Sequence, residues 1–489
     1  MAIDGLKSFY DEYKFRFQTL TEEQVETILK AAFRIYGEYG YRVQSGEARK
    51  ILVDAGGSCE GEIVKLPREL ILRCLATVAH DLKIYDRSGK LAMHSKGTNT
   101  FFGLAPTNPY VDDFETGEQR RGTRQDVINA AIVADACENV DFLMGLAQIS
   151  DEDLNVQLSD VYEGYEMFTN STKPAFIWGI DETGLATQVK MAEIIAGGAD
   201  KLVEKPFLAM FVGCPDTPLS LNERAFKSLK YAVETGLPVI WMGGGQLGSS
   251  VPVTLAGAEV VDVCDMLIGV VLSQLIRPGC PLIAGFSFTT VDMKTMTSAY
   301  GGPEHCLAES MLADVVHYLG MPTMQTAGAV DSKVLDAQAG VETAMNVLVN
   351  VLAGGNFVHD VGFTDGAMSG SLDQIVFCDD VISYAKRIGR GVEVDEDTLA
   401  EDVIRAVGWG GNFLATDHTA ENFREELWFS KLFDHSVYAD WAERKLDMRA
   451  RVHAKTAEIL ANHRAPALSD EIMAQLRAVL AEAEAAKKQ

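Results

Sequence analysis

The stretch from 322 to 340 brings several chemically capable residues together in the loop after a predicted strand. A short strand and a turn of small residues lead to Asp331, Ser332 and Lys333, and a helix follows. In parallel α/β proteins the loops at the carboxyl ends of strands carry the chemistry, so this loop is a candidate site. The competing interpretation is that Asp331 or Asp336 simply caps the following helix.

His359 lies at the end of another strand-like run and is followed directly by Asp360. An imidazole at such a position can donate a hydrogen bond to an anionic substrate group, act as a base near neutral pH, or be a satisfied core histidine. Lys333 has the chemistry to form a Schiff base with a carbonyl substrate. The residues alone leave these interpretations open.

Aromatic side chains also occupy the ends of the predicted strands, where lysine, arginine and paired carboxylates are scarce. Aromatic side chains in this arrangement favour binding of a quaternary ammonium ion, which has no hydrogen-bond donor and is held by aromatic faces through cation-π attraction. Core packing is the alternative for each ring taken singly. The predicted substrate-binding residues are Trp178, Trp241 and Phe288 for the ammonium group, His359 with the backbone amides near Phe102 and Gly103 for a carboxylate, and Gln325.

Strand-like runs that alternate with helical spacing must position these residues. The strands are expected at 100–104, 142–149, 174–179, 206–213, 238–242, 281–288, 322–326 and 356–362. The helices are expected at 124–137, 153–168, 183–195, 222–234, 254–273, 304–319, 337–352 and 374–388. Eight β-α units predict a closed (β/α)8 barrel. A doubly wound open sheet is the alternative, but no run is followed by a glycine-rich nucleotide-binding motif.

The barrel pattern covers 97–390 and is flanked by two other regions. Residues 1–96 are expected to form an α+β cap, in which Thr21 and Gln24 have the spacing of a capping box. Residues 391–489 are expected to form a helical extension, and the stretch from about Tyr438 is expected to be a long charged helical region. We expect this extension to serve packing or oligomer formation.

Composition narrows the class of protein. The 489 residues are 47% hydrophobic and carry a formal net charge of -27, which argues against nucleic acid as a partner. No segment has the length and apolar character of a membrane span, and residues 1–10 lack the apolar core of a signal peptide. The eight cysteines lack ligand-like spacing, so we expect buried reduced thiols, no zinc site and a cytoplasmic location.

Short motifs that keep their order along nearly the whole chain carry a family resemblance. They are Leu-Thr-Glu-Glu-Gln at 20–24 and the segments 116–123, 169–174, 252–257, 277–279, 291–295, 331–340 and 425–428. With these motifs the chain resembles the trimethylamine methyltransferase superfamily of corrinoid-dependent enzymes. The resemblance is to the branch without pyrrolysine, whose characterised members demethylate glycine betaine and related quaternary amines.

The resemblance implies a (β/α)8 barrel that moves a methyl group from a methylated amine to the cob(I)alamin of a separate corrinoid protein. Trimethylamine enzymes of the family carry pyrrolysine in the region that corresponds to 327–331, where this sequence has standard residues only. A quaternary amine is therefore the expected substrate. Asp331, Ser332 and Lys333 would face the docked corrinoid, and neither a catalytic side chain nor a tightly bound metal is expected.

Two other functions remain open at this point. A barrel lyase or aldolase would use Lys333 as a Schiff base, and a betaine-binding protein would hold the same ligand without reaction. The chain is expected to form a homo-oligomer, since symmetric assembly is common among cytosolic enzymes.

Overall fold

The computed structural model describes residues 17–213 and 215–487. In these ranges seven parallel strands form one sheet, and an eighth segment closes it, because Phe142 pairs with Gly103 and Leu143 pairs with Ala175. The predicted (β/α)8 barrel is confirmed. The strand order is β6 (Phe101–Leu104), β18 (Phe357–Val361), β17 (Thr323–Thr326), β14 (Leu282–Phe286), β12 (Val239–Gly243), β10 (Leu208–Phe211) and β9 (Ala175–Trp178).

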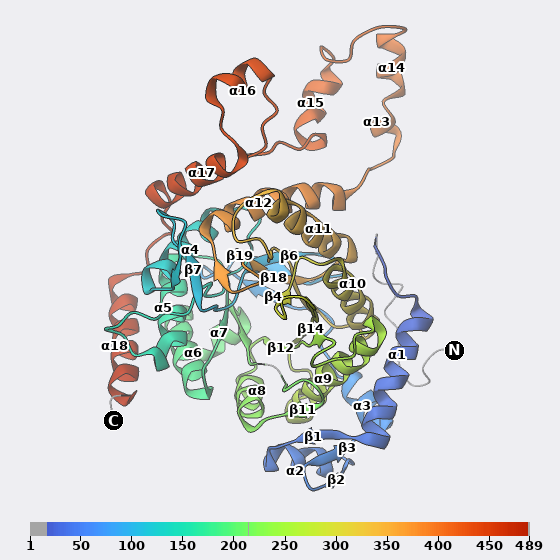
Figure 1. Ribbon diagram of the computed structural model, residues 1–489, viewed down its shortest axis with the longest axis vertical. Coiled ribbons are helices and arrows are strands. Elements are labelled where there is room, and N and C mark those ends of the chain that lie inside the picture. The colour runs from blue at the N-terminus through green and yellow to red at the C-terminus, as the bar shows by residue number, and fades with distance from the viewer. Residues whose placement is uncertain (1–16, 214, 488–489) are drawn as a thin grey trace.

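The helices that follow these strands form a ring around the barrel (Figure 1). They are α4 (Arg124–Ala136), α5 (Ser159–Asn170), α6 (Glu182–Ala196), α8 (Glu223–Thr235), α9 (Leu255–Ile276), α10 (Pro303–Tyr318), α11 (Ala337–Ala353) and α12 (Leu372–Arg390). Each overlaps a segment that was predicted from helical spacing. A short 3-10 helix (Val156–Leu158) and α7 (Ala199–Glu204) lie in the connections.

Local signals explain where these helices begin and end. The side chain of Asn222 accepts a hydrogen bond from the Ala225 amide at the start of α8, and Gly236 ends this helix in the left-handed region. Asp336 accepts from the Ala339 amide in the same way at the start of α11. The capping interpretation of Asp336 is therefore confirmed.

Phenylalanine rings fill the barrel at the amino ends of its strands. The rings of Phe142 and Phe176 stack with centroids 4.0 Å apart, and Phe357 contacts both Phe176 and Phe101. Gly103 is required beside them, because a Cβ at this position would overlap the Phe142 ring. This half of the interior is a packed core, so a site must lie at the carboxyl ends of the strands.

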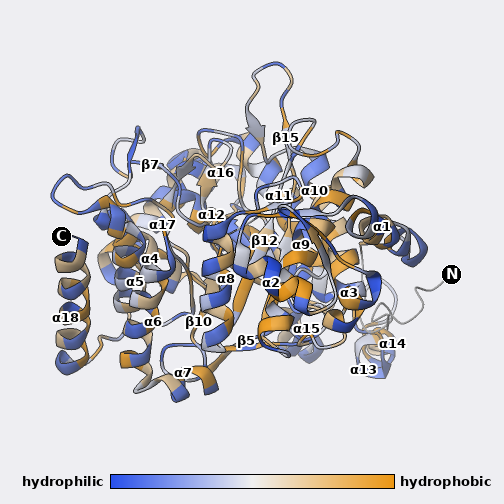
Figure 2. Ribbon diagram, turned by 90° about the horizontal axis from the view of Figure 1, so that it is seen from below, coloured by the Kyte–Doolittle hydropathy of each residue, from blue (hydrophilic) through white to orange (hydrophobic). Residues whose placement is uncertain are grey.

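Small sheets built from the connections surround the carboxyl ends. One has the order β19 (Phe363–Thr364), β20 (Ser369–Gly370), β7 (Tyr110–Asp112) and β8 (Gln119–Arg121). The other joins β13 (Gln246–Leu247), β15 (Thr289–Val291) and β16 (Ser298–Ala299). Figure 2 shows β7 and β15 standing on the same side of the molecule. We call the end of the barrel where the carboxyl ends of its strands lie, together with the hairpins around it, the mouth.

The cap packs on the outside of the barrel against α9. It contains α1 (Glu22–Arg34), a π-helical turn (Ile35–Tyr39), β1 (Tyr41–Val43), α2 (Gly46–Asp54), β2 (Ser58–Glu60), β3 (Ile63–Lys65), α3 (Arg68–Leu75), β4 (Lys83–Tyr85) and β5 (Leu91–His94). The capping box of Thr21 and Gln24 is present. The strand β1 also pairs with β11 (Ser220–Leu221) of a barrel connection, so the sheet of the cap is continuous with the barrel.

The C-terminal region divides into an arm and two docked helices. The helices α13 (Glu396–Leu399), α14 (Glu401–Val407), α15 (Asp417–Glu426) and α16 (Tyr438–Arg444) project away from the ring (Figure 1). The helix α17 (Met448–Asn462) packs on α12 and α4, and α18 (Asp470–Lys487) packs on α6 and α5. The region expected to be helical from Tyr438 onwards consists of three helices, because Lys445 adopts a positive φ at the first junction and Pro466 interrupts the second.

In the described part of the chain, no helix has both the length and the apolar character needed to cross a bilayer. Most thiols are buried, as expected: Cys74, Cys137, Cys264, Cys280 and Cys378. Cys59 is exposed and Cys306 is half-buried, so the expectation is wrong for these two. Cys214 and the N-terminal residues 1–16 lie outside the described residues.

Candidate active site

Four side chains from four strands point towards the mouth. His359 of β18 places its Nε2 atom 3.3 Å from the Met242 sulfur of β12, and its ring centroid lies 6.1 Å from that of Phe211 on β10. Trp178 of β9 is the register partner of Phe211 and therefore points to the same side of the sheet. Phe211 and Trp178 are half-buried while His359 is buried, so two aromatic rings and an imidazole form the floor.

An irregular strand orients His359. The pairing of β18 with β6 shifts between Val358 and Val361, and Asp360 adopts a φ of 84°. In a regular strand Asp360 would point away from its neighbour, but this bulge brings Oδ1 of Asp360 to 2.6 Å from Nδ1 of His359. The carboxylate therefore lies beside Nδ1, while Nε2 lies on the Met242 side of the ring.

A buried carboxyl group supports Trp178 from behind. The Trp178 indole donates to Oε2 of Glu163 at 2.8 Å, and the Thr107 hydroxyl donates to the same oxygen at 2.5 Å. Burial raises the pKa of Glu163 to about 8, although these hydrogen bonds oppose the shift. Gly145 leaves room for this carboxyl, since a Cβ there would overlap it. Sequence reasoning missed Glu163 because it lies inside a helix.

A second buried carboxyl group is hydrogen-bonded to the strand that neighbours His359. Thr326 is the register partner of His359, and both its amide and its hydroxyl donate to Glu309 of α10, at 2.9 and 2.8 Å. Ser287 donates to Glu309 at 2.5 Å, and Nε2 of His305 lies 2.9 Å from the Thr326 hydroxyl. Burial raises the pKa of Glu309. This network fixes the ends of β14 and β17 next to the imidazole.

The loop that holds Asp331 forms part of the rim. The Asp331 carboxylate accepts hydrogen bonds from the amides of Tyr300 and Gly301 at 2.8 and 2.9 Å, and so holds the connection after β16. Ser332 donates to Asp336 at 3.0 Å. Lys333 points outward, with 70% of its side chain exposed, and its Nζ donates to the Asp331 carbonyl and lies 3.3 Å from Asp365.

The barrel, its aromatic floor and the order of the motifs agree with the comparison to known proteins. A family model described as trimethylamine methyltransferase matches residues 8–487. The chain belongs to the trimethylamine methyltransferase family. Glycine betaine methyltransferase from Desulfitobacterium hafniense (strain Y51) is 32% identical, with 96% of this chain and 97% of that protein covered. Trimethylamine methyltransferase MttB from Desulfitobacterium hafniense (strain DSM 10664 / DCB-2) is 30% identical, with 98% and 94% covered.

Solved structures of methyltransferases share the fold of this family member. Monomethylamine methyltransferase (MtmB) from Methanosarcina barkeri superposes with a TM-score of 0.52 at 9% identity, and 93% of this chain and 90% of that one are covered. The hydroxylamine complex of MtmB gives a TM-score of 0.53 at 10% identity, with 94% and 90% covered. At such low identity the likeness concerns the fold alone.

Not every predicted site residue reaches the mouth of this methyltransferase. Trp241 is fully buried on the outer face of β12, where its indole donates to the Asp265 carbonyl of α9 at 3.0 Å. Gln325 likewise points outward and donates to the Glu309 carbonyl. In a parallel sheet consecutive residues alternate between the two faces, so the end of a strand does not by itself place a side chain inside. The predicted positions of Trp241 and Gln325 are wrong.

Phe102, Gly103 and Phe288 are corrected for related reasons. Phe102 is buried between β6 and the helix layer, where the Lys386 ammonium lies 5.8 Å from its ring. The space beside Gly103 is filled by the Phe142 ring. Phe288 packs in a separate small cluster with Leu247 and Val251 beneath the hairpins. Of the predicted substrate-binding set, only Trp178 and His359 point towards the mouth, and the structure adds Phe211 and Met242.

Proposed function

We propose that this family member moves a methyl group from a quaternary amine, glycine betaine or a related betaine, to the cob(I)alamin of a separate corrinoid protein. Its partners would be that corrinoid protein, the small amine and further copies of the same chain. A cytoplasmic location is part of the proposal, and it rests on the composition described above.

The observation that carries the proposal is the floor of the mouth. Phe211 presents a half-buried aromatic face next to the imidazole of His359, and the half-buried Trp178, its register partner, points to the same side of the sheet. Aromatic faces attract a trimethylammonium group that cannot be gripped by hydrogen bonds. Nε2 of His359 is the polar atom proposed to hold a substrate carboxylate at the other end, since the Asp360 carboxylate lies beside Nδ1.

For this reaction the protein has to align the substrate, and no proton transfer is needed. A quaternary ammonium leaves as a neutral amine, so the carbon-nitrogen bond is already activated, and the corrinoid of the partner supplies the nucleophile. In this proposal the aromatic floor orients the nitrogen. The rim of hairpins, held by Asp331 through Tyr300 and Gly301, is the surface over which we propose that the corrinoid protein docks.

The alternative functions fit less well. A Schiff-base lyase needs a lysine that is desolvated beside the substrate, but Lys333 is largely exposed and interacts with Asp365 outside the barrel. A betaine-binding protein would use the same floor without reaction, and only an assay of the transfer distinguishes it from the enzyme.

The test is to mix the protein with a reduced corrinoid protein and a panel of betaines and methylamines, and to follow methylation of the cobalt by absorbance. We expect turnover with a betaine and none with trimethylamine. Betaine binding without a spectral change would support the binding protein, and trimethylamine turnover would contradict the proposed substrate class. Borohydride trapping of Lys333 with a carbonyl substrate would support the lyase.

A further inference from the structure

Residues 391–446, which we call the arm, leave the barrel after α12 and return to it at α17. Among the described residues, 14 of the 30 exposed large hydrophobic side chains lie in this short segment. They are Val392, Val394, Leu399, Ile404, Trp409, Phe413, Leu414, Leu427, Phe429, Phe433, Val437, Tyr438, Trp441 and Leu446. Such a concentration of exposed apolar surface marks an interaction site.

The helices of the arm cannot be stable without a surface to pack on. They contain 4, 7, 10 and 7 residues, and none of these residues is buried. Isolated helices shorter than about 12–15 residues are only marginally stable in water, because the free energy of nucleation is not offset by so few hydrogen bonds. The outer part of the arm therefore needs a partner.

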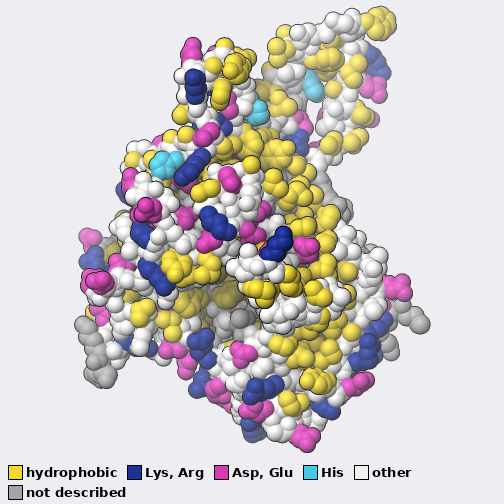
Figure 3. Space-filling model, in the orientation of Figure 1, with side chains coloured by type: hydrophobic (Ala, Val, Ile, Leu, Met, Phe, Trp, Pro, Cys, Tyr) yellow, Lys and Arg dark blue, Asp and Glu magenta, His cyan; other side chains and the backbone are white. Residues whose placement is uncertain are grey.

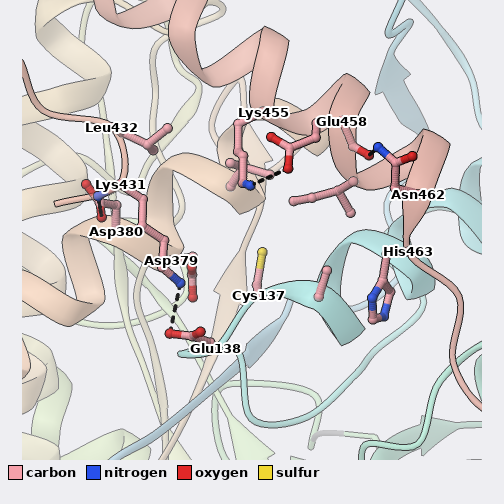
Figure 4. A pocket seen from close by; sticks show the side chains of 13 residues that line it. Cys137, Glu138, Asp379, Asp380, Lys431, Leu432, Lys455, Glu458, Asn462 and His463 are labelled. Carbon is pink, nitrogen blue, oxygen red and sulfur yellow. Dashed lines mark hydrogen bonds and ion pairs between the residues drawn. The ribbon is translucent and has the colours of Figure 1, made fainter.

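The root of the arm, residues 425–433, is held firmly on the barrel. Trp428 donates to Ser383 of α12 at 2.8 Å, and Arg390 donates to the Glu425 carbonyl at 2.6 Å. Figure 4 shows the ion pair between Lys431 and Glu138, 2.8 Å long, at a cavity of about 430 Å³ beneath the root. The arm is thus presented in a defined direction and is not a loose tail.

An apolar trough lies beside this root. It is a cavity of about 720 Å³ between α11, α12 and the foot of α17. Its lining includes Val341 and Met345 of α11, which are 65% and 52% exposed, Tyr384 of α12, Phe433 of the root and Met448. Figure 3 shows hydrophobic side chains gathered over α11 and α12 on this face. One chain therefore carries both an apolar arm and an apolar receptor.

We propose that the arm of one copy of this chain packs into the trough of a second copy, and that the exchange is reciprocal about a two-fold axis. The trough borders the root of its own arm. When two copies lie root to root, each arm can therefore pack into the trough of the other copy at the same time. The exposed hydrophobic side chains of the arm offer on the order of 1,000 Å², if each large side chain has roughly 150 Å². A standard interface buries about 800 Å² on each partner.

The direction of the arm favours a second copy over the corrinoid protein. Figure 1 looks along the barrel into the ring of helices, and the arm leaves this ring sideways at α12. A protein that delivers a corrinoid to the mouth must approach along the barrel axis instead. The interface does not depend on the substrate or on methyl transfer, so its test is independent of the proposed function.

The experiment measures the mass of the full-length protein by sedimentation over a range of concentrations. The arm variant carries Trp409→Glu and Leu414→Glu, and the trough variant carries Val341→Glu and Met345→Glu. Each should raise the dissociation constant of the assembly at least about 100-fold, since buried charges at the centre of an interface are not tolerated. Tyr39→Glu, at an exposed site in the cap, is the matched control and should leave the mass unchanged.

Mixing the two variants is the decisive step. The arm variant keeps a native trough, and the trough variant keeps a native arm. A mixed pair can therefore form one native contact between arm and trough. Assemblies should reappear in the mixture although neither variant assembles alone. Circular dichroism and thermal melting show that the variants are folded. A native protein that is monomeric at micromolar concentration, an unchanged mass in either variant, or a mixture that stays dissociated would overturn the proposal.

Discussion

The indole N–H of Trp178 donates to the buried carboxyl of Glu163 across 2.8 Å, which links the one predicted tryptophan that faces the mouth to a carboxyl group raised in pKa by burial. The pair explains why Trp178 is held at the strand end while Trp241, two strands away, turns outward. Its two residues have different testable consequences.

The pKa of Glu163 predicts a pH-dependent stability. Its value of about 8 in the folded protein lies above the ordinary value of a glutamate, so the folded state binds a proton that the unfolded state releases. This contribution is complete below about pH 4 and is lost as the pH rises towards 8. Glu163→Gln should abolish this loss, because the amide is neutral throughout. The melting temperature of the native protein should fall relative to the variant between pH 5 and 8, and parallel curves would contradict the assignment.

Trp178 and Trp241 form a matched pair for substrate binding. Trp178→Leu should weaken binding of glycine betaine about 10-fold or more, since a desolvated cation-π contact contributes up to about 2 kcal/mol. Trp241→Leu should lower the melting temperature, because Trp241 is fully buried, but leave the affinity of the folded protein unchanged. Isothermal titration calorimetry measures both affinities. An unchanged affinity in Trp178→Leu would remove this ring from the proposed site.

His359 is expected to recognise the carboxylate of the substrate. His359→Ala should weaken binding of glycine betaine about 10-fold or more but change the affinity for tetramethylammonium, which has no carboxylate, less than about 2-fold. His463→Ala is the control, since that histidine lies 2.7 Å from Asp135 at the cavity beneath the root of the arm and far along the chain from β18. Equal losses for both ligands would show that His359 has a structural role only.

The packed half of the barrel predicts opposite effects for two glycines. Gly103→Ala should lower the free energy of unfolding by about 1–3 kcal/mol, because its methyl group would overlap the Phe142 ring. Gly340→Ala should raise it by up to about 1 kcal/mol, because the position lies inside α11 with open space around it. Denaturant unfolding of the two variants checks both signs, and a stabilised Gly103→Ala protein would contradict the described interior.

The elements of the fold were largely predictable because their signals are local. All eight strand-like runs and the eight predicted helices correspond to barrel segments, and Thr21 and Asp336 cap helices where short-range spacing places a cap. The rim hairpins were not predicted, because strands of two or three residues, such as β13 and β19, have no periodicity to detect.

The site was only partly predictable, for a reason that lies in strand geometry. Trp178 and Trp241 both lie near the end of a strand, yet one faces the mouth and the other faces α9. Phe211 was overlooked although it pairs with Trp178, and Glu163 and Glu309 reach the strand ends from helices far along the chain. Contacts between residues that are far apart in the sequence cannot be predicted from the residue spacing within one segment.

The sequence by itself determined the family, the closed barrel and the acidic character of this protein, because alternation, caps and composition act within short segments of chain. Only the tertiary structure decided which rings face the mouth, that a bulge turns Asp360 onto His359, and that the arm stands away from its own barrel. These outcomes depend on the register between neighbouring strands and on what packs behind each side chain, and both are set by residues distant in the sequence.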